Sequence, residues 1–378
     1  MRKVLTAALL ASALSVPALA ADGALKVVSI DVEGGGGTLF VTPEGISLLI
    51  DTGWPAGAGL LPSPDGAQNS ADRIVAAAKK LGVKKIDYLI ITHYHMDHVG
   101  GVADLAKRIP IGTFIDHGAN VEHVAPGEKV PPDLKGGTPD DLYPKYLEVI
   151  KGHPHIVAKP GQVIAMGSMT DTIVASDGVA MKTVLAGAGA KNAACDTAEA
   201  LSTKDEGGAE NTHSVASLVS YGKVKIAMFG DLSWKVEHDL SCPVTRLGHV
   251  QVLIATQHGS KISSNPASIA DMKPDIAVVG MSGKKGGDEG PIKTIQASPG
   301  LQGLWQTHES YAMPALGAAN KNMVANLNPP AADVAKYSKA MFTAPPDQGH
   351  AIHLDVFKDG KVVVTNDRNG FSKTYQTK

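Results

Sequence analysis

Short runs of β-branched and aliphatic residues, divided by glycine-rich turns, dominate the first part of the chain. Three such runs predict a meander of strands at 25–31, 38–42 and 46–50. A further apolar run at 85–91 predicts a buried strand, and helical spacing at 70–80 predicts a helix before it. Strands that alternate with helices are typical of an α/β protein.

The same alternation continues along the chain. Further strands are predicted at 111–116, 215–221, 223–229, 250–255 and 275–280, with a hairpin at 162–175 and two closing strands at 350–357 and 361–365. Further helices are predicted at 102–108, 140–151 and 331–342, and after the hairpin that ends at 229. We expect the strand at 275–280 to be the last strand of the core.

Two long segments interrupt this pattern. Residues 118–140 are rich in proline, glycine and charge, and residues 186–210 are small and polar. Loops of this length inside a compact domain are usually functional. We expect both to be insertions in one domain that spans 21–378 and carries a helix and hairpin extension from about residue 290.

The first twenty residues have the pattern of a secretory signal peptide. Arg2 and Lys3 precede an apolar stretch, and Ala18-Leu19-Ala20 has the small residues of a cleavage site. The alternative is a membrane anchor, but the apolar stretch is shorter than the ~20 residues of a span. We expect cleavage after about Ala20, a periplasmic or secreted protein, and no transmembrane segment in the mature chain.

The charge of the chain argues against a nucleic-acid partner. Cleavage removes two of the 35 basic residues, so that 33 basic residues face 37 acidic ones, a formal charge of −4. Tight binding of long DNA needs a broad basic face. We therefore expect no stable nucleic-acid complex, and a small molecule or a short phosphodiester as substrate.

The chain has two cysteines, Cys195 and Cys242. Neither has a second cysteine at the spacing of a metal site. Because an exported chain meets an oxidising environment, a disulfide between them is one alternative and two free thiols are the other.

The densest group of chemically active residues follows the strand predicted at 85–91. Three imidazoles and one carboxylate fall within six residues, namely His93, His95, Asp97 and His98. Neutral imidazole and carboxylate are ligands of zinc and similar divalent ions, and loops held by rigid elements often carry chemistry. A polar turn that is rich in histidine by chance is the alternative.

Four more residues lie at predicted strand boundaries: Asp51, His213, Asp231 and His258. Each alone would be an ordinary polar turn. With the histidine cluster, the last three complete the set of about seven ligands that a dinuclear site needs, besides a bridging water. Asp51 is predicted either to cap a turn or to orient a metal ligand from behind.

Residues 24–283 resemble the metallo-β-lactamase-fold hydrolases, and among them the ComEC-like branch. That branch comprises the extracytoplasmic hydrolase domain of a competence DNA-uptake protein and its stand-alone relatives. The resemblance rests on Leu49-Ile50-Asp51-Thr52-Gly53, on residues 92–101, on Asn211 with Ser214, on Phe229-Gly230-Asp231 and on His258-Gly259-Ser260. It implies a four-layer αββα sandwich of two mixed sheets, with the metals at one edge between them.

The resemblance also implies a ligand assignment. His93, His95 and His213 would hold one divalent ion, Asp97, His98 and His258 a second, and Asp231 would bridge both. Zinc is expected, with manganese or iron as alternatives. The chain departs from the branch at Gln257, where a histidine is common, and at His213, where one is often absent; the second departure favours a full two-metal site.

These residues predict hydrolysis. A water that bridges two divalent ions has its pKa lowered towards about 7, which supplies hydroxide at neutral pH. Asp97 is expected both to ligate a metal and to orient the nucleophile or accept its proton. We expect a secreted dinuclear zinc hydrolase of phosphodiesterase type, with lactone or β-lactam hydrolysis as one alternative and a non-catalytic binding protein with a vestigial site as the other.

Overall fold

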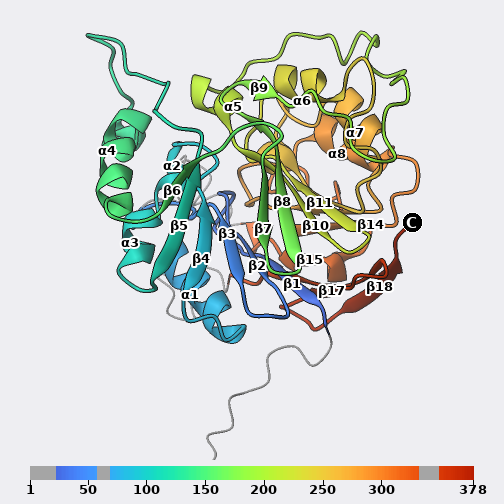
Figure 1. The fold of residues 1–378 in the computed structure, drawn as a ribbon, viewed down its shortest axis with the longest axis horizontal. Coiled ribbons are helices and arrows are strands. Elements are labelled where there is room, and N and C mark those ends of the chain that lie inside the picture. The colour runs from blue at the N-terminus through green and yellow to red at the C-terminus, as the bar shows by residue number, and fades with distance from the viewer. Residues whose placement is uncertain (1–22, 58–68, 332–348) are drawn as a thin grey trace, which may run out of the picture.

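The computed structural model describes residues 23–57, 69–331 and 349–378 (Figure 1). The predicted signal peptide, and all but the first residue of the helix predicted at 331–342, lie outside the described residues. Within the described ranges, no helix is both long enough and apolar enough to cross a membrane.

The first of two β-sheets has the strand order β18-β17-β16-β1-β2-β3-β4-β5-β6. Its strands are β1 Leu25–Ser29, β2 Thr38–Val41, β3 Ser47–Ile50, β4 Ile86–Ile90, β5 Ile111–Asp116, β6 His155–Val157, β16 Ile352–Val356, β17 Lys361–Asn366 and β18 Ser372–Gln376. Strands β3 to β6 run parallel, whereas the others pair antiparallel, as the predicted meander requires. The sheet is therefore mixed.

The second sheet has the order β15-β14-β13-β12-β11-β10-β8-β7, and β9 pairs with β8. Its strands are β7 Val163–Met166, β8 Met169–Ser176, β9 Val179–Ala180, β10 Ala216–Tyr221, β11 Val224–Met228, β12 Val252–Ile254, β13 Ile276–Val279, β14 Gly303–His308 and β15 Val324–Asn326. Strands β11 to β15 run parallel. This sheet is also mixed.

Helices cover the outer face of each sheet (Figure 1). Those of the first half are α1 Ser70–Lys80, α2 Met96–Val99, α3 Val102–Ala106 and α4 Pro139–Ile150. Those of the second half are α5 Ala209–His213, α6 Trp234–Ser241, α7 Pro266–Met272 and α8 Glu289–Gln296. In the described ranges, the short 3-10 helices are η1 Pro132–Leu134, η2 Thr256–Gly259 and η3 Lys321–Met323.

Alternate residues of single strands pack into different cores. In β3, Leu48 and Ile50 pack between the two sheets, while Leu49 packs under the helices of the first sheet. In β12, Leu253 packs under the helices of the second sheet. Successive side chains of a strand point to opposite faces, so strands that are buried on both faces read as continuous apolar runs. The predicted αββα sandwich is confirmed.

One prediction about the sheets is wrong. The strand predicted at 275–280 does not end the core, because β14 pairs in parallel with β13 and β15 continues the sheet. In β14, Trp305 is followed by Gln306, Thr307 and His308, which are all buried. Polar residues that are buried by tertiary contacts give no apolar pattern, which is why the strand was missed.

The C-terminal strands β16, β17 and β18 extend the first sheet. Strand β16 pairs antiparallel with β1, so residues 352–376 extend the first sheet on the side away from β6. The predicted extension from about residue 290 is thus built into the sandwich. Cys195, in the 186–210 insertion, forms a disulfide with Cys242 at the end of α6.

Candidate metal centre

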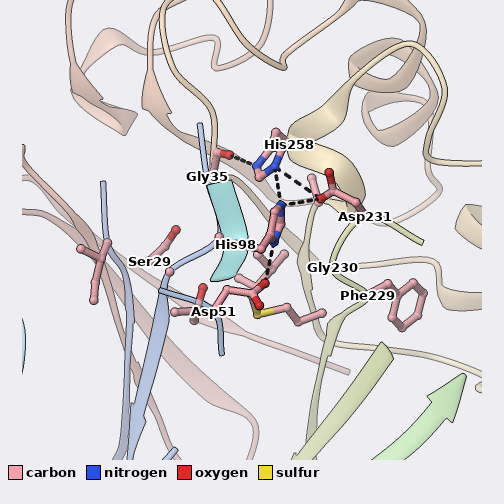
Figure 2. Close-up of a pocket in the computed structure, with 16 residues that line it drawn as sticks. Ser29, Gly35, Asp51, His98, Phe229, Gly230, Asp231 and His258 are labelled. Atoms are coloured by element: carbon pink, nitrogen blue, oxygen red, sulfur yellow. Dashed lines mark hydrogen bonds and ion pairs between the residues drawn. The ribbon is translucent and has the colours of Figure 1, made fainter. Parts of the chain in front are cut away.

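The histidine cluster and its distant partners follow strands that end at the same edge of the sandwich, and Figure 2 shows His98 of the cluster beside Asp231 and His258. Asp51 follows β3 and the cluster follows β4, and these two strands are parallel neighbours. Asp231 follows β11 and His258 lies in η2 after β12, which are also parallel neighbours. Because the carboxyl ends of parallel neighbours lie at the same edge, residues far apart in the sequence come together there.

Four ligand atoms converge on one point: Asp97 Oδ2, His98 Nε2, Asp231 Oδ1 and His258 Nε2. His98 Nε2 lies 3.2 Å from each of the other three, His258 Nε2 lies 3.3 Å from each carboxylate oxygen, and the two carboxylate oxygens lie within 4.8 Å of each other. A regular tetrahedron whose edges all had the length of these five distances would place its corners about 2.0 Å from the centre, the length of Zn–N and Zn–O bonds. These residues fit a divalent ion, and we call them the tetrahedral position.

The opposite nitrogens of both histidines are held by acceptors. His98 Nδ1 lies 2.7 Å from Asp51 Oδ2 (Figure 2). His258 Nδ1 donates to the carbonyl oxygen of Gly280 at 2.9 Å. A carbonyl oxygen only accepts, so His258 carries its proton on Nδ1 and turns the lone pair of Nε2 towards the cluster. Partners of this kind fix the tautomer and the ring orientation of metal-binding histidines.

The charges at the tetrahedral position suit a cation. Burial alone would raise the pKa of Asp97, but the Lys285 ammonium and His98 hold it well below its usual value. Against burial, His98 and His258 lower the pKa of Asp231. Burial alone would lower the pKa of His98, but the Asp231 and Asp97 carboxylates raise it well above its usual value. Two ionised carboxylates are thus held in a buried site, where positive charge from His98 and Lys285 balances them and a divalent ion could take over that role.

His93 and His95 face a second, adjoining position. His93 Nε2 lies 3.0 Å from His95 Nδ1, and the rings of His93 and His98 have centroids 4.1 Å apart. His95 Nε2 lies 3.2 Å from Glu122 Oε2, so a carboxylate again stands behind the ring. Burial and the neighbouring His98 and His95 lower the pKa of His93, which keeps its imidazole neutral, the form that binds metal. We call this pair the paired-histidine position.

The structure does not place His213 with this pair, and its assignment as a ligand of the first ion stays a prediction. His213 ends α5, and its Nδ1 lies 2.7 Å from Asp177 Oδ1 in the turn between β8 and β9. With His117 it forms a separate group of metal-capable side chains. The Asp177 carboxylate orients the His213 ring towards His117. This contact between distant segments cannot be read from a sequence pattern.

Three residues of the site have a strained backbone conformation. Asp51, Gln257 and His258 have φ angles of 63°, 49° and 58°, in the left-handed region. Residues with a side chain seldom adopt this region, at a cost of roughly 1–3 kcal/mol each. Three such residues around one cluster indicate that the direction of their side chains matters more than local backbone energy.

The glycine-rich turn between β1 and β2 packs directly against the cluster. A side chain on Gly36 would place its Cβ 2.5 Å from Asp51 Oδ2 and 2.7 Å from His98 Nδ1. The Gly36 N–H donates to the carbonyl oxygen of Asp97 at 2.9 Å. The glycines therefore serve close packing behind the ligands, besides making the predicted hairpin turn.

A family comparison agrees with this architecture. Residues 33–179 match the family described as the Metallo-beta-lactamase superfamily. The chain has the metallo-β-lactamase fold. This match supports the superfamily prediction over residues 33–179, and the resemblance to the ComEC-like branch stays a prediction.

Individual relatives of this metallo-β-lactamase-fold chain are distant. A stretch of 49 residues is 43% identical to a hydroxyacylglutathione hydrolase of Rhodopseudomonas palustris (strain BisB5), covering 13% of this chain and 19% of that protein. The match thus spans about a fifth of the relative's length. The metallo-beta-lactamase fold protein YhfI from Bacillus subtilis is 14% identical, with 72% of this chain and 93% of that chain covered and a TM-score of 0.39. CmlA, a diiron beta-hydroxylase from Streptomyces venezuelae, is 13% identical, with 68% and 44% covered and a TM-score of 0.35.

A cavity of about 450 Å³ opens beside the two metal positions. His95 and Asp97 form part of its wall, and most of the rest comes from the 118–140 insertion, including Glu122. Lys285, which also lines it, contacts Asp97 through its ammonium. Sequence reasoning singled out neither Glu122 nor Lys285, because a lone charge in a loop carries no spacing signal.

Proposed function

We propose that the protein is a dinuclear, metal-dependent hydrolase with zinc as its metal, and manganese or iron as alternatives. The observation that carries this proposal is the convergence of four ligand atoms at tetrahedral spacing. When bound, the ions supply an acidified water and polarise the bond under attack. A non-catalytic protein with a vestigial site is less well supported, because this position retains all four of its ligands.

Each residue has a part in this proposal. Asp97, His98, Asp231 and His258 would hold one ion, His93 and His95 would hold the other, and Asp231 would be shared between them. Asp97 would also orient the attacking water or accept its proton, since it lines the substrate cavity as well as the tetrahedral position. Asp51 and Glu122 keep the imidazoles of His98 and His95 in their ligating orientation.

A phosphodiester is the substrate class that we favour. The resemblance to the ComEC-like branch supports it, and so does a lysine in the wall of the cavity beside the metals. Hydrolysis of an acyl bond, in a lactone or a β-lactam, is the second candidate. The 49-residue match to a hydroxyacylglutathione hydrolase favours that candidate, because the relative's name describes an acyl substrate.

We further propose that the enzyme acts in the periplasm or outside the cell. The signal-peptide pattern of residues 1–20 and the disulfide between Cys195 and Cys242 support this location. Expression of the full chain followed by cell fractionation, with mass determination of the mature N-terminus, tests it. Retention of the intact N-terminus in the cytoplasmic fraction would contradict it.

Metal analysis coupled to a substrate panel tests the activity. The purified protein is expected to contain divalent metal, to lose turnover of bis-p-nitrophenyl phosphate on chelation, and to regain it with zinc. Nitrocefin and a simple lactone in the same assay separate the two substrate classes. Turnover that survives complete metal removal would refute the proposal.

Two histidines at opposite ends of β12 give a matched pair of variants. His258→Gln is expected to lose metal and turnover, because its Nε2 is one corner of the tetrahedral position. His249→Gln is the control, since His249 lies before β12 and pairs with Asp275 instead. Equal loss in both variants would point to a general folding defect.

A further inference from the structure

The cavity beside the metal centre has an uneven distribution of charge. Among the described residues that line it, Lys285 is the only lysine or arginine. The carboxylates of Glu122 and Glu128 also line it, but both have partners: Glu122 Oε2 lies 3.2 Å from His95 Nε2, and Glu128 Oε2 accepts from the Ala125 N–H at 3.1 Å. Lys285 is therefore the group in this wall that is suited to bind an anion.

The backbone holds Lys285 in place. The Ser282 hydroxyl oxygen accepts from the N–H groups of Lys284 and Lys285 at 3.2 and 2.9 Å, and the Ser282 N–H donates to the Lys285 carbonyl oxygen at 2.9 Å. The ammonium lies 5.3 Å from the centre of the Trp54 ring, within the range of a cation–π contact. The turn and the Trp54 ring thus hold the Lys285 ammonium at the cavity, so that little further conformational entropy is lost when an anion binds.

The carboxylate that pairs with the Lys285 ammonium is also a candidate metal ligand. Lys285 contacts Asp97 Oδ2, which is also a corner of the tetrahedral position. If Asp97 held a divalent ion there, the charge of its carboxylate would be neutralised and the ammonium would be repelled. A half-buried cation that loses its carboxylate needs another anion, and the nearest open space is the cavity that both residues line.

The rest of the wall indicates what that anion is attached to. The 118–140 insertion contributes the apolar side chains of Val124, Val130, Pro131 and Leu134, and Trp54 and Met96 add to them. Pockets of this size that combine apolar walls with a few polar groups hold small organic molecules. The wall therefore suits an apolar substituent on the anion.

We infer that Lys285 is the anion-binding residue of the substrate site and that the cavity takes a singly charged organic phosphodiester with an apolar substituent. In this arrangement the ammonium binds a non-bridging phosphate oxygen, and the insertion holds the organic group. The inference rests on the proposed hydrolase function, and it adds the residue that binds the phosphate and the apolar nature of the organic group. The Lys285 ammonium binds the substrate phosphate directly, whereas Trp54 only positions the ammonium.

Two esters with the same leaving group but different charge test the role of Lys285. The zinc-loaded protein and its Lys285→Gln, Lys285→Arg and Lys293→Gln variants are assayed with bis-p-nitrophenyl phosphate, an anion, and with p-nitrophenyl acetate, which is neutral. Lys285→Gln is expected to raise KM for the phosphate about 10-fold or more and to change kcat/KM for the acetate less than about twofold. Lys285→Arg, which keeps the charge, is expected to stay within about threefold of wild type for both.

Lys293→Gln is the control, because it removes the same charge from an exposed side chain of α8 that pairs with Glu289. It is expected to leave both substrates unaffected, with zinc content and thermal midpoint equal to wild type in every variant. An equal effect of Lys285→Gln on both esters, or no effect on the phosphate, would overturn the inference.

Inorganic phosphate separates this inference from the proposed function. Its binding to the zinc-loaded protein, followed by calorimetry, needs no turnover. About 10-fold weaker phosphate binding in Lys285→Gln, but not in Lys293→Gln, supports the anion site. This holds even if the wild type hydrolyses neither ester. Failure to hydrolyse the esters would refute only the hydrolase proposal. Unchanged phosphate binding in Lys285→Gln would overturn the anion site, whatever the enzyme hydrolyses.

Discussion

The two candidate metal positions adjoin each other but are built to different degrees. The tetrahedral position has four ligand atoms from three segments of the chain, at distances that already suit an ion. The paired-histidine position has only His93 and His95 facing each other, and the third histidine expected there turns to Asp177 instead. The difference teaches that one histidine-rich motif can supply two sites of unequal strength. We expect one ion to bind tightly and the other weakly.

The largest effect is expected from His98→Ala. His98 Nε2 is the corner that lies 3.2 Å from all three other ligand atoms. Its loss should abolish tight zinc binding and lower kcat/KM for the reactive substrate by about 1000-fold or more. Zinc content by mass spectrometry and steady-state kinetics measure both effects. A variant that keeps one tightly bound zinc would show that the tetrahedral position is not the tight one.

His95→Ala should have a smaller effect. It removes half of the paired-histidine position, and it leaves the tetrahedral ligands in place. We expect loss of the weaker zinc ion, retention of the tight one and a drop in kcat/KM of about 10- to 100-fold. Zinc titration against a chromophoric chelator resolves the two affinities. Loss of both ions together would break the distinction between the positions.

Asp51→Asn tests the support behind the tetrahedral position. The carboxylate holds His98 Nδ1 at 2.7 Å and also accepts from the Thr92 N–H at 2.8 Å. Removal of such partners typically weakens metal affinity about 10- to 100-fold. We expect this loss for the tight zinc ion, while the weak ion changes less. An unchanged affinity of the tight ion would mean that Asp51 only caps its turn.

The smallest effect is expected from His213→Ala. The structure places this side chain with Asp177 and His117, away from the two positions. We expect zinc stoichiometry to be unchanged and kcat/KM to stay within about twofold of wild type. Loss of the weak ion in this variant would restore His213 as its ligand and would make the two positions more equal than the structure indicates.

Much of the architecture follows from local patterns. The helix predicted at 70–80 coincides with α1, whose Asn69 cap accepts from the Asp72 N–H at 3.0 Å. The meander and the parallel strand at 85–91 were also recognisable, because their residues are buried on both faces and read as apolar runs. Strand β14 was not recognisable in the sequence, because its buried polar residues are satisfied only by hydrogen bonds to distant segments. One example is the hydrogen bond from the Thr307 hydroxyl to the Met281 carbonyl oxygen.

The sequence by itself determined the fold class and placed Asp97, His98, Asp231 and His258 at the ends of strands. Each of these residues follows an apolar run that predicts a strand. The parallel order of the strands then brings the residues to one edge of the sandwich. Only the tertiary structure decided which way each ring turns. Asp177 holds His213 away from the pair, and no spacing along the chain encodes this contact.

The residues that surround the metals were likewise decided by tertiary structure. Glu122 stands behind His95, and Lys285 reaches Asp97 across 188 positions of sequence. Side-chain direction depends on contacts between distant segments, whereas the period of a strand or a helix depends on neighbours. For this reason the chain's pattern indicated where the chemistry lies, and the packing of its loops determined what surrounds it.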